Sequence, residues 1–259
     1  MLRTSPEQFE ELARRGRHVP VLRESLADLD TPLSLFRKLD DGATAFLLES
    51  VEGGEKWARY SFLGVGARAT FRARGSLVEW TEGGRTEVVT AAGDPLEVLR
   101  ERLRAFAAVQ PEQTGLPRFL GGAVGMIAYD WVRFVEAIPD SNPDRVGLPD
   151  AFFVLPEYVV VYDNVRHTAL IAIHAEVAPG EDPRAAFAAA DARRRSAAPP
   201  ASPAGFRVER FEPPPTAYFF FAAGLTVGRG IGAGGKGESF QRSITHFQGP
   251  PPLRRHTVR

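Results

Sequence analysis

A carboxylate and a hydroxyl, Glu49 and Ser50, directly follow a short apolar run, Phe46-Leu47-Leu48. A polar loop with two glycines comes next, and a second run, Tyr60-Ser61-Phe62-Leu63-Gly64, follows it. This pattern predicts strand, turn and strand, with Glu49 and Ser50 at the end of the first strand. Such strand ends are common places to hold a small polar ligand, because the rigid sheet fixes the donors and acceptors. The same residue types also build ordinary hairpin turns, so the pattern alone leaves a ligand site and a turn both open.

Composition excludes several classes of function. The chain has 259 residues, with 32 basic and 32 acidic side chains and no cysteine. A net charge of zero gives no reason to expect nucleic acid, an anionic membrane or a polyanionic substrate as a partner. The lack of cysteine excludes disulfides, thiolate zinc sites and a cysteine nucleophile. No signal peptide is recognised in residues 1–17, and no apolar stretch of about 18 residues is present to span a bilayer. We therefore expect a cytoplasmic protein.

Other residues that could do chemistry are better explained by structure. The five histidines lack the spacing of a metal site, and His167 and His174 would point to opposite faces of a strand. Asp130 and Asp163 have no positioned partner in the sequence, so we interpret them as cap or turn residues.

A glycine-rich segment, Gly230–Lys236, matches the first seven positions of a phosphate-binding P-loop. The eighth position must be Ser or Thr, whose hydroxyl binds Mg²⁺, and here it is Gly237. A glycine-rich segment of low complexity also matches such a short motif by chance. We therefore do not predict a nucleotide site.

The apolar and polar patterns predict more strands than helices, joined mostly by hairpins. Capping residues followed by proline predict helices that start near Ser5, Thr31 and Asp182, and apolar spacing predicts another at 94–103. The expected strands are 18–23, 45–48, 59–64, 69–73, 76–80, 151–154, 158–162 and 168–174. The fold class is therefore α+β, with largely antiparallel sheets packed with helices.

Three glycines, Gly121, Gly122 and Gly125, lie within five residues of an apolar segment that we expect to be a strand. Glycine inside a strand loses conformational entropy and packs poorly. It is suited to places where two backbones approach closely, so we predict a structural role for this segment.

The composition changes near residue 197, which divides the chain into three parts. Residues 1–196 have the patterns of a folded region, 197–212 have a linker composition, and 213–259 are rich in Gly, Pro and Arg. The last part shows neither helical nor alternating periodicity, so we expect it to be disordered or non-native. The abrupt change also suggests a truncated or frameshifted gene product.

Several segments together resemble anthranilate synthase component I, the chorismate-using subunit of tryptophan biosynthesis. The ordered series covers about residues 18 to 175. It comprises Val19-Pro20-Val21, Asp30-Thr31-Pro32-Leu33-Ser34, Leu47-Leu48-Glu49-Ser50, Tyr60-Ser61-Phe62-Leu63-Gly64, Gly121-Gly122-Ala123-Val124-Gly125, Tyr129-Asp130 and Leu148-Pro149-Asp150. Met126 is a departure, because the family more often has an aromatic residue there. The resemblance implies the N-terminal half of the family's β-sandwich.

In that family, the Leu-Leu-Glu-Ser run lines the site where L-tryptophan binds as a feedback inhibitor. Carried over, Glu49 and Ser50 would face the ligand's ammonium group and Leu48 would face its indole ring. Arg59, on the following strand, would lie near the ligand. A carboxylate, a hydroxyl and an apolar wall suit these groups chemically.

The resemblance also implies what this chain lacks. The family's catalytic residues for chorismate, Mg²⁺ and ammonia lie in a further C-terminal region, so we expect no catalytic residue here and no bound metal. The intact family enzyme needs Mg²⁺ and a glutamine amidotransferase subunit, component II. Two alternatives stay open: a fragment of aminodeoxychorismate synthase component I, and a non-catalytic remnant that binds an amino acid or docks to a subunit.

Overall fold

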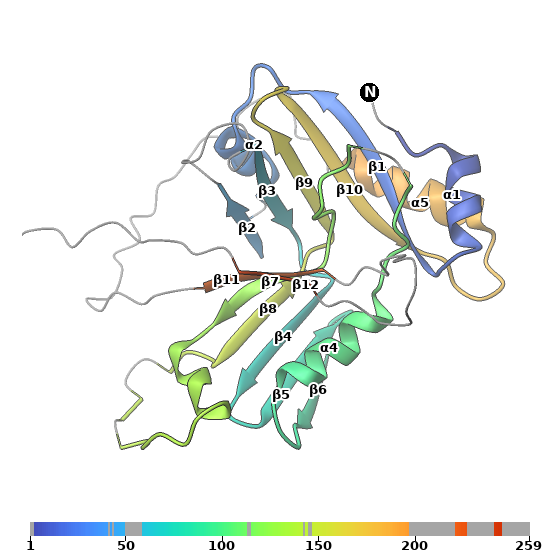
Figure 1. Cartoon of the computed structure of the whole chain (residues 1–259). Helices are drawn as coiled ribbons and strands as arrows, with labels where there is room; N and C mark the ends of the chain where they lie inside the picture. Colours follow the sequence, from blue (N-terminus) through green and yellow to red (C-terminus); the bar gives the residue numbers. More distant parts are fainter. Residues whose placement is uncertain are drawn as a thin grey trace, which may run out of the picture.

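Two antiparallel sheets and a small number of helices make up the described part of the chain (Figure 1). In this computed structural model the described residues are 3–40, 42, 44–49, 59–112, 115–141, 143–144, 147–196, 221–226 and 241–244. The predicted fold class, antiparallel sheets packed with helices, is confirmed.

The first sheet has five strands in the order β1-β10-β9-β3-β2, all paired antiparallel. Its strands are β1 (His18–Leu26), β2 (Ala45–Leu48), β3 (Tyr60–Val65), β9 (Tyr158–Asp163) and β10 (Thr168–Glu176). Only β2–β3 and β9–β10 are neighbours in sequence. The other two pairings, β1 with β10 and β3 with β9, join strands that are far apart in the sequence.

The second sheet has seven strands in the order β12-β11-β7-β8-β4-β5-β6. Its strands are β4 (Ala69–Arg74), β5 (Leu77–Glu82), β6 (Arg85–Thr90), β7 (Ala123–Ile127), β8 (Ala151–Leu155), β11 (Phe221–Thr226) and β12 (Gln241–Ile244). Short links from β3 to β4 and from β8 to β9 connect the two sheets (Figure 1).

Helix starts follow the capping residues in the sequence. At α1 (Pro6–Ala13), the Ser5 hydroxyl accepts a hydrogen bond from the backbone N–H of Gln8, and Oε1 of the Gln8 side chain accepts one from the backbone N–H of Ser5. At α2 (Pro32–Leu39), Thr31 and Ser34 make the same reciprocal pair. The remaining helical segments are α4 (Leu96–Ala105), α5 (Pro183–Ser196) and the 3₁₀ helix η1 (Tyr129–Phe134).

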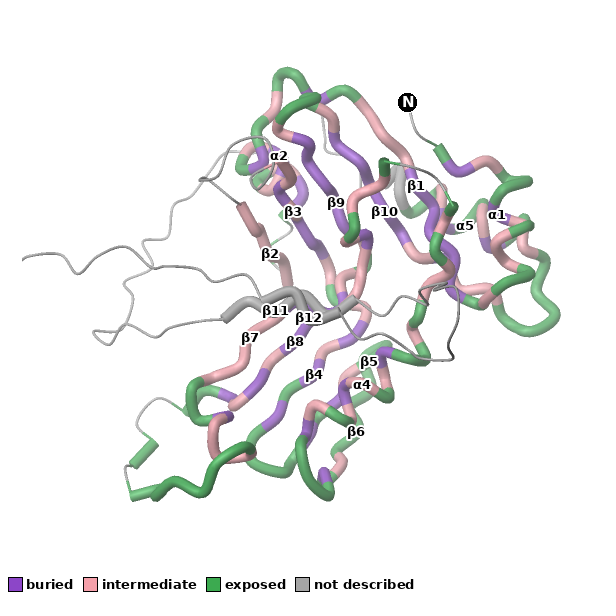
Figure 2. Tube along the Cα trace, in the orientation of Figure 1, coloured by how far each residue is buried: buried purple, intermediate pink, exposed green. Residues whose placement is uncertain are grey.

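Each sheet has its own hydrophobic core. Helices α1, α2 and α5 cover one face of the first sheet through buried residues such as Phe9, Leu35 and Ala190. Segment 116–120 packs on the opposite face, and α4 covers the second sheet through Leu99 and Leu103. Figure 2 shows the consequence: buried residues run along β9, β10 and the first half of β1 in the first sheet, and along β4 and β8 in the second.

Three elements differ from the sequence-based expectations. Strand β6 was not predicted, because its two valines are adjacent and point to opposite faces, so the sequence shows no apolar face; all of its residues except half-buried Val89 are exposed. His167 does not lie in a strand: it is in the turn before β10, at φ 51°. Gly121 and Gly122 precede β7, so of the three glycines only Gly125 is a strand residue.

Strands β11 and β12 fall within 213–259, where we expected no regular structure. β11 belongs to an apolar run, and its backbone pairs with the outer edge of β7, which would otherwise be unpaired. The P-loop lookalike and the linker 197–212 lie outside the described residues.

Close approach of neighbouring atoms explains two of the three glycines: the approach is by a backbone at Gly125, as the sequence indicated, and by a side chain at Gly121. A Cβ built on Gly125 would clash with the carbonyl oxygen of Phe152 and lie 2.6 Å from Cα of Phe153. A Cβ on Gly121 would clash with the ring of His174. Side chains are therefore excluded at both positions.

We expect Gly125→Ala to lower the free energy of unfolding by about 1–3 kcal/mol, because the obstructing atoms belong to a neighbouring backbone that cannot rotate away. Gly93→Ala is the matched control, since a Cβ there meets nothing within 4 Å. Chemical denaturation measures both. Equal midpoints for the two variants would contradict the packing of β7 against β8.

Candidate functional site

The predicted site residues lie at one end of the β2–β3 pair. Leu48 is the last residue of β2 and is paired with Phe62 of β3. Glu49 follows it directly, and Arg59 directly precedes Tyr60, the first residue of β3. Because antiparallel neighbours run in opposite directions, the end of β2 and the start of β3 meet at the same corner of the sheet. Ser50 lies outside the described residues.

An ion pair fixes Arg59 at this corner. Its Nε and Nη2 both donate to Oδ2 of Asp163, at 3.1 and 2.8 Å, from a residue 104 positions away. The guanidinium carbon also lies 4.9 Å from the centre of the Tyr60 ring. Arg59 remains 40 % exposed while the Asp163 carboxylate is 8 % exposed. The buried Asp163 carboxylate thus fixes the Arg59 guanidinium, while part of the guanidinium stays exposed to solvent.

Asp163 also closes the β9–β10 turn. Its Oδ1 accepts hydrogen bonds from the backbone N–H groups of Val165 and Arg166, at 3.0 and 3.1 Å. Burial alone would raise the pKa of this carboxyl, but the bond from Arg59 and the two backbone bonds outweigh burial and hold the pKa below its ordinary value. The sequence indicated a turn residue here and missed the pairing with Arg59, because only the β3–β9 register brings the two together.

An apolar wall stands on the face of the sheet that carries Leu48. Directly paired residues share a face, so Leu48 and Phe62 lie on the same side. The Phe62 ring packs edge-on against Phe119, with centroids 5.6 Å apart, and lies 6.4 Å from the Tyr60 ring. The corner therefore combines aromatic surface with the positioned cation of Arg59, beside the position of Glu49 in the chain.

Asp130, the other aspartate considered in the sequence, lies in η1 and forms an ion pair with Arg133, 3.1 Å away. Within the described ranges there is no cluster of three or more His, Asp or Glu side chains that could hold a metal ion. None of the described helices is both long and apolar enough to cross a bilayer.

The chain is similar in sequence to curated proteins that share one name. Three curated relatives, each named anthranilate synthase component 1, illustrate the similarity. The relative from Thermus thermophilus is 44 % identical over 170 residues, which is 65 % of this chain and 34 % of the relative. That from Acinetobacter calcoaceticus is 38 % identical over 187 residues, 69 % and 37 %. That from Pseudomonas aeruginosa is 43 % identical over 163 residues, 61 % and 32 %.

These matches confirm the resemblance seen in the sequence: the chain is similar to anthranilate synthase component I. It spans about a third of the length of the curated relatives it matches. No protein-family model matches. The crystal structure of anthranilate synthase component I from Streptococcus pneumoniae TIGR4 aligns with 68 % of this chain and 37 % of that one, at 19 % identity and a TM-score of 0.38. The sequences themselves show the similarity.

Replacing Asp163 by Asn should lower the free energy of unfolding at neutral pH by about 1–3 kcal/mol, because a charge-assisted pair is lost at a buried position. A depressed pKa stabilises the fold above the ordinary aspartate pKa of about 3.9 and stops doing so as pH falls through the folded-state pKa. The difference between wild type and variant should therefore close as pH falls below about 4.

Denaturation at pH 7 and in stepwise acid measures this effect. Glu79→Gln is the control, because Glu79 and Arg72 are 3.8 Å apart and both roughly half exposed, a pair worth little. If the difference in free energy of unfolding between wild type and Asp163→Asn stays constant down to pH 3, the charge pairing is refuted.

Proposed function

We propose that this region is the tryptophan-binding, regulatory part of an anthranilate synthase component I. The observation that carries the proposal is the meeting of Leu48, Glu49 and Arg59 at one corner of the first sheet, within a region similar in sequence to curated relatives of that name. The corner pairs charged groups of both signs with an apolar wall. That is the complement of a zwitterion with a large aromatic side chain.

In this proposal each residue meets a different part of the ligand. Glu49 pairs with the α-ammonium group, and the Ser50 hydroxyl adds a hydrogen bond. Leu48, with the aromatic residues beside it, contacts the indole ring. Arg59 faces the ligand's carboxylate with its Nη1, the terminal nitrogen that makes no hydrogen bond to Asp163. The Asp163 carboxylate keeps that guanidinium in place.

The whole enzyme's activity is part of the same proposal: chorismate and glutamine-derived ammonia are converted to anthranilate and pyruvate. The relatives' printed name, component 1, supports a second component as partner, which we propose to be the glutamine amidotransferase subunit. The Mg²⁺ that the intact family enzyme needs belongs to this proposal for the whole enzyme, and the described residues contain no cluster of three or more His, Asp or Glu side chains to hold it. A cytoplasmic location agrees with a sequence that has no cysteine for disulfides.

The 259-residue chain should not make anthranilate, because the resemblance assigns the catalytic residues to a part of the family beyond the region matched here. The measurement is chorismate-dependent anthranilate fluorescence with ammonium and Mg²⁺ supplied. A complete component I assayed alongside is the positive control. Fluorescence from the purified chain would overturn the assignment of a purely regulatory role.

Ser50→Ala should weaken tryptophan binding by about 0.5–1.5 kcal/mol, the net worth of one hydrogen bond, and leave the melting temperature nearly unchanged. Calorimetric titration with tryptophan measures the affinity, and Ser141→Ala, at an exposed position, is the matched control. A lowered melting temperature with unchanged affinity would make Ser50 a turn residue only. No binding by the wild-type chain would contradict the proposed site.

A further inference from the structure

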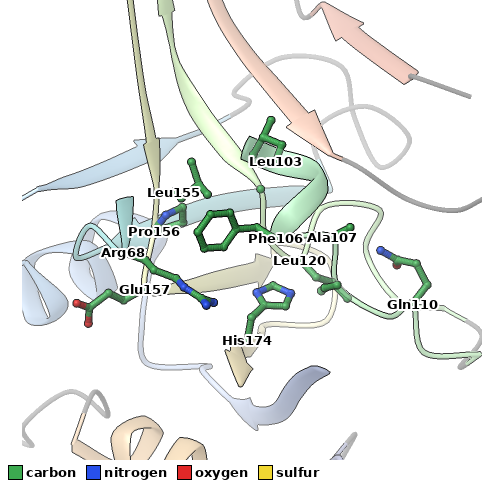
Figure 3. A pocket seen from close by; sticks show the side chains of 13 residues that line it. Arg68, Leu103, Phe106, Ala107, Gln110, Leu120, Leu155, Pro156, Glu157 and His174 are labelled. Carbon is green, nitrogen blue, oxygen red and sulfur yellow. The ribbon is translucent and has the colours of Figure 1, made fainter. Parts of the chain in front are cut away.

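A small cavity lies where the two sheets join, away from the β2–β3 corner. Its volume is about 60 Å³, roughly twice the volume of one water molecule in the liquid. Arg68 and His174 are directed toward one another there (Figure 3), and Nη2 of Arg68 donates to Oε2 of Glu176 at 2.7 Å. Glu176 also pairs with Arg17, and Glu157 in the lining supplies a second carboxylate, so the charges around the cavity balance. No group here selects a ligand over water.

The outer edge of β6 is a row of backbone groups with which no described strand pairs. β6 is the last strand of the second sheet and its ladder runs only to β5 (Figure 1). One pair beyond the strands, the N–H of Ala91 donates to the carbonyl of Ser76 at 2.8 Å. Hydrogen-bonded pairs alternate along an antiparallel ladder, so every second residue of β6, counted back from Ala91, bonds to β5. The other three, Thr86, Val88 and Thr90, direct their N–H and C=O groups outward.

β6 lacks the features that usually keep a second strand away from an edge. Edge strands in native proteins commonly carry proline, lysine or a bulge. The sequence of β6 contains neither proline nor lysine, and its register with β5 is continuous over all six pairs. The connecting residues, Gly83 and Gly84, have φ of 55° and 77°, as a two-residue type I′ hairpin requires. The outer edge is therefore regular along its whole length.

The two faces of β6 differ in what an added strand would meet. Directly paired residues share a face, and Glu87 is paired with Trp80, which packs against α4. The Glu87 carboxylate forms an ion pair with Arg102 of α4, so its charge is neutralised. On the opposite face Val88 is 63 % exposed and Leu77 of β5 is 52 % exposed. A strand beside β6 would cover Val88 and leave the contacts of α4 intact.

We propose that β6 pairs with β6 of a second copy of this chain, antiparallel and about a two-fold axis at Val88. In this register Val88 lies opposite Val88 of the second copy, and Thr86 lies opposite its Thr90. All the outward N–H and C=O groups of both edges then lie in hydrogen-bonded pairs. Glu87 lies opposite Val89 of the second copy, so no like charges meet. This proposal does not depend on the tryptophan site.

Charge and strand length select this register among those that a two-fold axis allows. An axis at Glu87 would set two carboxylates directly opposite one another, which is destabilising. An axis at Thr86 or at Val89 would carry one end of each edge past the end of the other strand. With the axis at Val88, Arg85 lies outside the paired residues, 86–90. Five residues on each strand make a small interface, so the dimer belongs to the weak class that buries less than about 1,200 Å².

Sedimentation equilibrium of the full chain, at concentrations from about 10 µM to 1 mM, tests the proposal in the range of a weak interface. We expect the average mass to rise with concentration toward twice that of the monomer. A chain that stays monomeric throughout overturns the proposal.

Two substitutions at the axis test the register. Val88→Lys and Val88→Glu each place two like charges opposite one another, so each variant alone should stay monomeric where the wild type dimerises. An equimolar mixture of the two should dimerise, because the introduced ammonium and carboxylate groups then meet. Both variants should fold, since Val88 is exposed, and circular dichroism checks this.

The matched control is Leu77→Lys, which makes the same change at an exposed apolar residue on the same face, one strand further from the edge. It should dimerise as the wild type does. Dimerisation of either Val88 variant alone, or a mixture of the two that stays monomeric, overturns the pairing at Val88.

Discussion

The antiparallel pairing of β3 with β9 is the contact on which the first sheet and its corner depend. It attaches the β2–β3 pair to β9 and β10 at the middle of the sheet, and its register sets Tyr60 opposite Asp163. Arg59 and Asp163 are then close enough to pair, although 104 residues separate them. A slip of one residue would turn Leu63 and Val65 out of the core and break the pair at the same time. Core packing and the geometry of the corner are thus specified by one alignment.

Local chemistry made much of the fold predictable. Ser5-Pro6 and Thr31-Pro32 marked helix starts because capping is decided within a few residues. The β4–β5 and β9–β10 pairs could also be predicted from local sequence, because turn residues lie between the two strands of each pair. β6 gave no signal, because an exposed edge strand without an apolar face looks like a polar loop. The apolar run of β11 was obscured by the glycines and prolines around it.

The site was predictable only in part. The polar residues after the apolar strand, beginning at Glu49, were visible in the sequence, but they fit an ordinary turn equally well, and only the resemblance to a family favoured a ligand site. The partner of Arg59 and the meeting of Arg68 with His174 depend on pairings between distant strands, which one sequence without relatives does not reveal. The glycine segment was also predictable only in part. The sequence predicted that other atoms approach these glycines closely, but it did not predict which ones: a backbone carbonyl at Gly125 and the imidazole of His174 at Gly121.

The pairing of β1 with β10 joins residues from opposite ends of the first sheet's sequence, as the contact of Arg17 with Glu176, 159 residues apart, illustrates. A ribosome adds about 5–20 residues per second, so β1 leaves the exit tunnel on the order of ten seconds or more before its partner exists. During that interval Val19 and Val21, both buried in the finished protein, have no strand to cover them. β1 therefore spends much of the time of synthesis without its partner, an interval in which a chaperone that binds extended apolar peptides would protect it.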